Sequence, residues 1–373
     1  MIRVAFLWSN LSGYLNACLK ELASRDGVEL LVSHQAPGEE APFDESQFAW
    51  MQNSLTWRTL KDLDALPQRL RAFSPDIMIT AGWHIPPYRR LAKKYAGKCV
   101  RLMMMDNAWN GTIKQRLGTL IASFHLRAAA DMAWIPGERQ AVFARKMGFG
   151  QRAILRGSLS CDHSAFAAVH RARIEAGQPV PRRFIFMGRL VPAKGIETLA
   201  RAYQIYRDTV RDPWPLICCG AGPLQAQLED KPGITIEGFV QPDQMPAKLA
   251  AAGCMVLPSD FEPWALVVHE ATSAGLLVLA SEPVGAAVHL VQPNYNGYIF
   301  GKRDAEGLAA LMVRIAHMKD HTLDAMSRAS YLLSEQYSPA RWADTLLDSF
   351  AARAQTRSSL SPAEGTVSTF NMN

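Results

Sequence analysis

The stretch "RFIFMGRLVPAKGIETLARAYQIYRD" (183–208) decides the fold that this sequence predicts. Its opening "RFIFMG" (183–188) is typical of a buried strand, and its end (195–208) is typical of a helix. The short loop between them carries a glycine and two cations. A buried strand followed at once by a covering helix is the repeating unit of a parallel sheet.

The same unit recurs on both sides of this stretch. Strands that alternate with helices are expected ahead of it at 2–8, 28–33, 76–80, 99–105, 130–136 and 153–157, and after it at 215–220, 234–239, 254–259 and 276–281. The sequence therefore predicts an α/β protein with two doubly wound, Rossmann-like domains, which face each other across a ligand-binding cleft.

The domain limits follow from composition and local signals. We expect an N-terminal domain at 1–170 and a C-terminal domain at 171–336, with a polar linker at 161–182. A last helix at 337–355 begins with a Ser-Pro pair and is expected to cross back to the N-terminal domain. Residues 356–373 have the composition of a flexible tail. The segment 35–60 has weak periodicity and is expected to run over the surface.

The overall composition is that of a globular protein. The chain has 373 residues, of which 49% are hydrophobic and 20% charged, and its net charge of +6 arises in the first half. No apolar run reaches the roughly 18 residues that a membrane span needs, and the first ten residues lack the apolar region of a signal peptide. The six cysteines form no CxxC pair, which favours buried free thiols in a reducing cytosol.

Two glutamates eight residues apart mark the first candidate site, in "EPWALVVHE" (262–270). Pro263 disfavours helical geometry at Glu262 and suits the first turn of a helix over 263–274, which Gly275 would end. The free N–H groups at 264–266 would then form an anion site. Glu270 would lie about 12 Å along the axis from Glu262. The plain alternative is a helix-start acid followed by a solvated glutamate.

Cations mark the second candidate site. Gly188 ends a strand and allows a close approach, while Arg189 and Lys194 follow on the loop, where two cations suit a diphosphate. The alternative is a pair of ordinary surface cations. A glycine turn at 218–224 is a weak signal alone. Another at 9–13 follows the first strand, and because it is not GxGxxG it disfavours a dinucleotide-binding domain.

In combination, these pieces resemble the retaining glycosyltransferases of family GT4, which have the GT-B fold. The order and spacing match over about 183–300, and the α/β layout matches over residues 1–354. The matching residues are Gly188-Arg189, Lys194-Gly195, Gly220-Ala221-Gly222-Pro223, Glu262-Pro263-Trp264, Glu270-Ala271, Gly275, Ser281 and Asn296-Gly297. Two departures are Ala265 and the "VGAA" at 284–287, where many members carry glycine.

The resemblance implies a metal-independent, cofactor-free transfer of a hexosyl unit from a UDP- or GDP-linked sugar. Arg189 and Lys194 would neutralise the donor diphosphate, Glu262 would hold the transferred sugar, and Glu270 would bind the ribose. The C-terminal domain would thus bind the nucleotide sugar, and the N-terminal domain the acceptor. The remaining donor-binding residues implied are Gly13, Gly188, Phe239, Val240, Trp264, Ala265, Leu266 and Val267.

Three polar residues of the first half are acceptor-side candidates: His84 in "TAGWHIPP", and Asp106 and Asn107 in "MMMDNAWNG". Each follows a predicted strand at its cleft-facing end. The resemblance implies same-face attack without a protein nucleophile, so that His84 would position groups or stabilise an oxocarbenium ion. The alternative for His84 is a structural histidine.

Basic residues gather in 86–101, with Arg89, Arg90, Lys93, Lys94, Lys98 and Arg101, and in 112–127, beside apolar residues. They form either a solvated face or a membrane-surface contact that suits a lipid-linked acceptor. Nucleic acid is disfavoured because few aromatic residues are interleaved. The expected setting is bacterial surface polysaccharide or glycolipid biosynthesis, in the cytoplasm or at the inner face of the plasma membrane.

Two other functions fit the same pattern. One is a catalytically silent GT-B subunit that binds a glycan or a partner, which the intact set of acids and cations disfavours. The other is a GT-B nucleotide-sugar epimerase or a sugar phosphorylase, which needs different cleft residues. The sequence leaves open the base of the donor, the sugar, the acceptor, the linkage and the oligomeric state.

Overall fold

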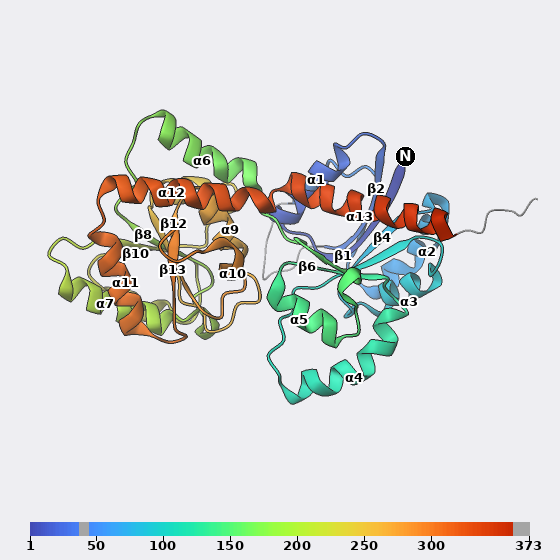
Figure 1. Cartoon of the computed structure of the whole chain (residues 1–373), viewed down its shortest axis with the longest axis horizontal. Coiled ribbons are helices and arrows are strands. Elements are labelled where there is room, and N and C mark those ends of the chain that lie inside the picture. The colour runs from blue at the N-terminus through green and yellow to red at the C-terminus, as the bar shows by residue number, and fades with distance from the viewer. Residues whose placement is uncertain (37–44, 361–373) are drawn as a thin grey trace, which may run out of the picture.

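The structure is a computed structural model that describes residues 1–36 and 45–360. Two α/β units lie side by side, with strands β1 to β7 in one and β8 to β13 in the other (Figure 1). This arrangement confirms the predicted pair of doubly wound domains.

The first sheet has seven strands in the order β3-β2-β1-β4-β5-β6-β7, all parallel. Its strands are β1 (Ile2–Asn10), β2 (Val28–Gln35), β3 (Ser54–Trp57), β4 (Ile77–Ala81), β5 (Val100–Met104), β6 (Met132–Ile135) and β7 (Ile154–Arg156). Its helices are α1 (Gly13–Ala23), α2 (Leu66–Phe73), α3 (Pro86–Lys94), α4 (Ile113–Arg127) and α5 (Glu138–Lys146).

The second sheet has six parallel strands in the order β10-β9-β8-β11-β12-β13. Its strands are β8 (Phe184–Met187), β9 (Leu216–Cys219), β10 (Ile234–Gly238), β11 (Cys254–Leu257), β12 (Leu277–Ser281) and β13 (Gly297–Phe300). The helices that follow in this part of the chain are α6 (His163–Glu175), α7 (Ile196–Thr209), α8 (Met245–Ala250), α9 (Leu266–Ser273), α10 (Ala287–Leu290), α11 (Ala305–Ala316), α12 (Asp320–Ser334) and α13 (Pro339–Leu360).

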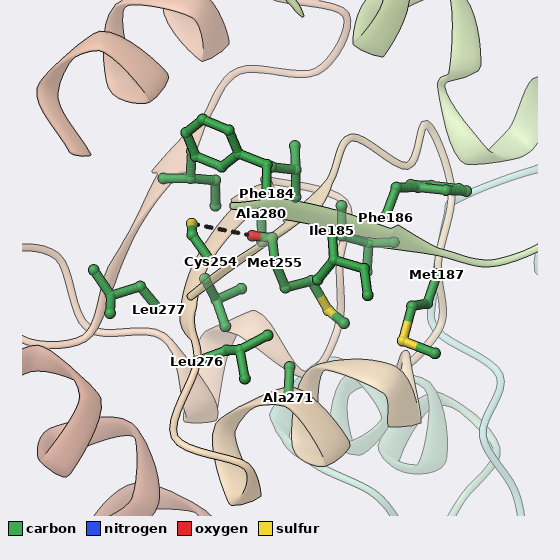
Figure 2. Packing of buried hydrophobic residues seen from close by; sticks show 14 of the residues in the cluster. Phe184, Ile185, Phe186, Met187, Cys254, Met255, Ala271, Leu276, Leu277 and Ala280 are labelled. Carbon is green, nitrogen blue, oxygen red and sulfur yellow. Dashed lines mark hydrogen bonds between the residues drawn. The ribbon is translucent and has the colours of Figure 1, made fainter. Parts of the chain in front are cut away.

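Continuous apolar strands explain why both sheets are covered on two faces. Every residue of β8, β11 and β12 is buried. Figure 2 shows the side chains of β8 and β11 packed together, with Ala271 of α9 and Leu276 beneath them. The six cysteines are free and buried, as expected. This packing fixes α9 against the sheet and so fixes the loop that leads into it.

The chain crosses between the units twice. The expected linker at 161–182 is mostly the helix α6, which packs on α8 and α9 of the second unit. Near the end, α12 and α13 follow one another along one side of both units (Figure 1). Trp342 of α13 packs against Trp134 in a tilted arrangement with ring centroids 4.6 Å apart, and it is buried in the first core. The two units are therefore held together by both crossings.

Two expectations about elements need correction. The segment 35–60 is not a simple surface excursion, because β3 pairs with β2 at the sheet edge and Trp57 is buried, its Nε1 donating to the Tyr88 hydroxyl at 2.7 Å. The last helix runs to Leu360, beyond the expected limit of 355. The remainder of the expected tail, 361–373, lies outside the described residues, as does 37–44.

Candidate active site

The candidate site lies where the strand order of each sheet reverses, between β1 and β4 and between β8 and β11. Ligands of doubly wound sheets bind outside the carboxyl ends of the strands at such points. In the second unit, the loops after β8 and β11 meet there. Gly195 brings them together, because a Cβ at this residue would lie 1.9 Å from the Pro258 carbonyl oxygen.

A cation and a carboxylate form the centre of the site. Lys194 makes an ion pair with Glu262, with 18% and 14% of the two side chains exposed. The Ser259 hydroxyl also donates to Glu262, at 3.4 Å. Arg189 is exposed nearby, and no ion pair or hydrogen bond of its side chain is found among residues 1–36 and 45–360. The structure thus joins three residues that the sequence predicted as a group.

A cavity of about 600 Å³ opens beside this pair, between the two units. Most of its wall comes from the second unit, and Tyr14, Asp106 and Leu159 close it from the other side. The predicted donor-binding residues on its wall are Gly188, Arg189, Lys194, Phe239, Val240, Glu262, Trp264, Ala265, Leu266 and Val267.

The expected helix over 263–274 begins three residues later, at Leu266. Residues 262–264 instead lie outside the helix, because the Gly285 N–H donates to the Glu262 carbonyl at 3.0 Å and the Ala286 N–H donates to the Trp264 carbonyl at 2.7 Å. The N–H groups at the helix start are consequently those of Leu266 and Val267, not those of Trp264 and Ala265. Gly275 ends the helix as predicted, with φ 76° and its N–H on the Thr272 carbonyl.

Ala265 makes the turn into α9 with φ 80° and ψ 79°, in the left-handed region. This conformation costs a residue with a Cβ about 1–2 kcal/mol and costs glycine almost nothing. The backbone therefore accounts for a preference for glycine here, independently of any room beside a bound sugar.

Glu270 does not line the cavity of Glu262. It lines a neighbouring cavity of about 570 Å³ between the units, with Gly13 on the opposite wall. Its carboxylate makes no hydrogen bond or ion pair within the described part of the chain, and burial raises its pKa to about 7. The two acids are thus set in adjacent cavities, rather than along one straight helix.

Gly13 begins α1 and faces Pro242 of the second unit. A Cβ at this position would meet Pro242 at 3.7 Å, an ordinary contact. Gly13 therefore has a place in the interdomain wall, but the packing around it does not itself require glycine.

The acceptor-side candidates His84, Asp106 and Asn107 meet in a third cavity of about 360 Å³, within the first unit. All three are exposed at its edge. Desolvation by the cavity walls raises the pKa of Asp106, and the nearby His84 opposes this effect. Asp106 also lines the cavity of Lys194 and Glu262, so the structure brings the two predicted groups into continuity.

Two residues near the site were not predicted. Tyr14 lines all three cavities, and burial raises its pKa. His269 is buried beside Glu270 and connects both chain crossings, since its Nδ1 accepts from the Cys161 N–H at 3.2 Å and its Nε2 donates to the Ser334 carbonyl at 3.0 Å. The only sequence signal for Tyr14 was its place after a glycine turn, and the sequence carried no signal for His269.

The basic segments are not one face. Arg101, predicted within the basic group, is 5% exposed and forms an ion pair with Asp131 at 2.8 Å. It also donates to the carbonyls of Ala92 and Ala128, so it ties α3 and α4 to the sheet. Lys94 and Lys98 remain exposed. Within the described residues, no group of three or more metal-ligating side chains is found.

Two doubly wound α/β units with a polar cavity between them have the layout of the GT-B fold, and comparisons with solved structures give the same fold. A glycosyltransferase from Rickettsia africae superposes with a TM-score of 0.72, at 15% identity, over 95% of this chain and 99% of that one. An Anabaena protein in complex with UDP-glucose superposes with a TM-score of 0.66, at 17% identity, over 96% and 100%. At these identities the likeness establishes the fold.

Sequence comparison places the clearest similarity in the second unit. Residues 173–332 match the family "Glycosyl transferases group 1". An uncharacterized glycosyltransferase from Methanocaldococcus jannaschii is 30% identical over 135 residues, which cover 34% of each chain. The chain spans about a third of the length of the curated relatives it matches. The match is consistent with the GT4 resemblance drawn from the motifs.

Proposed function

We propose that this protein is a retaining glycosyltransferase that moves a hexosyl unit from a UDP- or GDP-linked sugar to a saccharide or lipid-linked saccharide. The observation that carries the proposal is the interdomain cavity in which Arg189, Lys194 and Glu262 meet. Its volume of about 600 Å³ suits a nucleotide sugar. The structural neighbour crystallised with UDP-glucose gives this donor class further support.

The cations carry the largest catalytic effect in this mechanism. As the bond between the sugar C1 and the diphosphate oxygen breaks, negative charge builds on the leaving diphosphate, and Arg189 and Lys194 stabilise it. They fill the role that a divalent cation has in other transferases, so we propose that no metal is required. The acceptor oxygen attacks C1 from the same face, and its proton passes to the diphosphate oxygen.

The two acids orient the donor from opposite ends. Glu262, held by Lys194 and Ser259, accepts from hydroxyls of the transferred sugar. Glu270 accepts from the ribose hydroxyls, because it is an unpaired carboxylate on the wall of the adjacent cavity. The base lies against Phe239, a residue that is 57% exposed and lines the cavity.

The acceptor enters through the cavity of His84, Asp106 and Asn107, which joins the donor cavity at Asp106. In this arrangement Asp106 contacts the acceptor hydroxyl group, and His84 positions the sugar or stabilises its positive charge. Neither serves as the nucleophile.

We also propose that the protein works at the inner face of the plasma membrane, in surface polysaccharide or glycolipid biosynthesis, through α4. Ile113, Leu117, Leu120 and Ile121 are 59–76% exposed, and at 100° per residue they share an arc of about 100°. Lys114 and Arg116 flank this arc, and α4 contains no acid.

An anionic bilayer complements such a face, whereas a second copy would bring like charges together. None of the described helices has the length and apolar character to cross a bilayer. Cosedimentation with phosphatidylglycerol vesicles tests this contact. Leu117→Ser with Ile121→Ser should abolish it, while Lys94→Ser with Lys98→Ser should weaken it much less. Equal binding of wild type and the α4 variant would exclude this face.

Donor hydrolysis without acceptor tests the transferase itself. Wild type should bind UDP or GDP and hydrolyse a matching nucleotide sugar slowly, whereas Lys194→Ala and Glu262→Ala should each lose at least about 100-fold in rate while remaining folded. Near wild-type turnover in either variant would contradict the assigned roles. A wild type that bound neither nucleotide would favour the catalytically silent subunit.

A further inference from the structure

One buried amide, that of Gln140, joins the acceptor side of the cleft to the donor side. Gln140 lies in the first turn of α5 and is 0% exposed. Its Nε2 donates to the carbonyl of Asp106 at 3.2 Å and to the carbonyl of Pro263. Asp106 belongs to the first unit and Pro263 to the second, and both line the cavity of Lys194 and Glu262.

The number of hydrogens on Gln140 Nε2 equals the number of carbonyl oxygens that accept from it. A side-chain amide nitrogen carries two hydrogens, and here two carbonyl oxygens from different units face it. Both oxygens therefore lie within about 6 Å of each other. In the described part of the chain, the Oε1 atom of the same amide has no hydrogen-bond partner. The Nε2 side of Gln140 thus makes all of its hydrogen bonds, and all of them go to the walls of the site.

Other contacts between α5 and the second unit, called the junction below, bring α5 close enough for Gln140 to reach Pro263. A Cβ at Gly137 would lie 2.4 Å from His289 and 2.8 Å from Trp264, so only glycine allows the approach. The Glu138 N–H donates to His289 Nε2 at 3.1 Å, and Arg139 donates to the Glu282 carbonyl. Figure 1 shows α5 facing the second unit near α10, which carries His289.

We propose that Gln140 is a positioning residue that holds the acceptor-side loop at Asp106 in register with the donor-side loop at Glu262-Pro263. The inference rests on the proposed function. Because the two carbonyls belong to different units, both bonds exist together only when the units have the separation described here. A shift of about 1 Å between reacting groups lowers the rate about 100-fold, so this amide, together with the wider contact between the units, positions the reacting groups without touching substrate.

Three variants of the full chain test this role. Gln140→Met keeps the volume and removes both donors. Gln140→Asn keeps an amide but is one methylene too short to reach both carbonyls, and it provides the test if the methionine variant fails to fold. Arg139→Met is the matched control, because it removes a bond between the same two units that involves neither Asp106 nor Glu262-Pro263.

The first measurement is amide hydrogen exchange, which needs no activity. In Gln140→Met and Gln140→Asn, exchange should rise at 105–112 and 259–266, whereas Arg139→Met should leave both segments as in wild type. The second is the hydrolysis of UDP-glucose or of a GDP-linked hexose, whichever nucleotide wild type binds. The Gln140 variants should lose about 10- to 100-fold in kcat, with KM and the Kd for free UDP or GDP within about twofold, and Arg139→Met should lose less than threefold.

Two results would overturn the inference. One is unchanged exchange and kcat in a folded Gln140 variant. The other is an equal effect of Arg139→Met, which would assign the effect to the junction as a whole. Failure of the proposed function is distinguishable, since wild type itself would then bind neither nucleotide while the exchange measurement still decided the role of Gln140.

Discussion

Replacement of Glu270 with glutamine should stabilise the protein in neutral and alkaline solution. Burial raises the pKa of Glu270 from 4.5 to about 7, so the folded protein holds a proton that the unfolded chain has released. Below pH 4.5 both states are protonated and Glu270 has no effect. Between pH 4.5 and 7 the unfolded chain loses its proton first, and the stability of wild type falls as the pH rises.

The size of the effect follows from this shift. Above pH 7 the difference in pKa corresponds to about 3 kcal/mol of lost stability. A glutamine side chain has the shape of the protonated acid and has no charge to bury. The Glu270→Gln variant should therefore exceed wild type by about 3 kcal/mol at pH 8, by less than about 1 kcal/mol at pH 5, and by almost nothing at pH 4.

Urea unfolding of the apo protein at pH 4, 5, 6, 7 and 8 measures this difference. Glu262→Gln serves as the control. The Glu262 carboxylate is paired with Lys194, so its replacement should destabilise the protein near pH 7 and pH 8. Donor binding should change in the opposite sense, since ionised Glu270 accepts from ribose hydroxyls and the affinity for UDP or GDP should rise through pH 7. A stability difference that is constant with pH, or that grows in acid, would refute the burial of a titrating carboxyl at Glu270.

The remaining predictions concern the frame of the site. Ala265→Gly should stabilise by up to about 1 kcal/mol in denaturant titration, because it removes the left-handed strain at φ 80°; a destabilised variant would contradict this. Gly195→Ala should destabilise by about 3 kcal/mol or more and abolish nucleotide binding, since its Cβ would meet the Pro258 carbonyl at 1.9 Å; unaltered unfolding would show that the loops are not packed. His269→Ala should lower the melting temperature by leaving the Cys161 N–H and the Ser334 carbonyl unpaired. Burial lowers the pKa of His269 from 6.5 to about 3, so its contribution should be complete above pH 6.5 and lost as the pH falls towards 3; a pH-independent difference between variant and wild type would contradict this.

Much of the cavity of Lys194 and Glu262 could be predicted because its signals are local. Gly188, Arg189 and Lys194 follow one strand directly, and Glu262 follows the strand beside it in the sheet. Once the strands are parallel, their carboxyl ends must share an edge. The acceptor candidates were placed by the same reasoning, and His84, Asp106 and Asn107 do meet in one cavity.

The wrong predictions concern residues whose structure is not decided locally. Each of them depends on a partner from another element of the fold. The helix at 263 was expected from Pro263, yet residues 284–286 pair with the backbone of 262–264 and keep it out of the helix. Arg101 was predicted as part of a basic surface group, whereas in the structure it forms an ion pair with Asp131. No local pattern distinguishes these outcomes, because the competing hydrogen bonds come from other elements.

The sequence by itself determined the two parallel sheets and the loops that carry the site, because the apolar period of a strand and the residues at its end are local properties. Only the tertiary structure decided how the two units face each other. It set Glu270 and Glu262 in separate cavities, placed His269 between the chain crossings, and brought Gln140 to a carbonyl 123 residues away. Those contacts arise when two folded surfaces meet, and their geometry is fixed by packing between them rather than by any pattern along the chain.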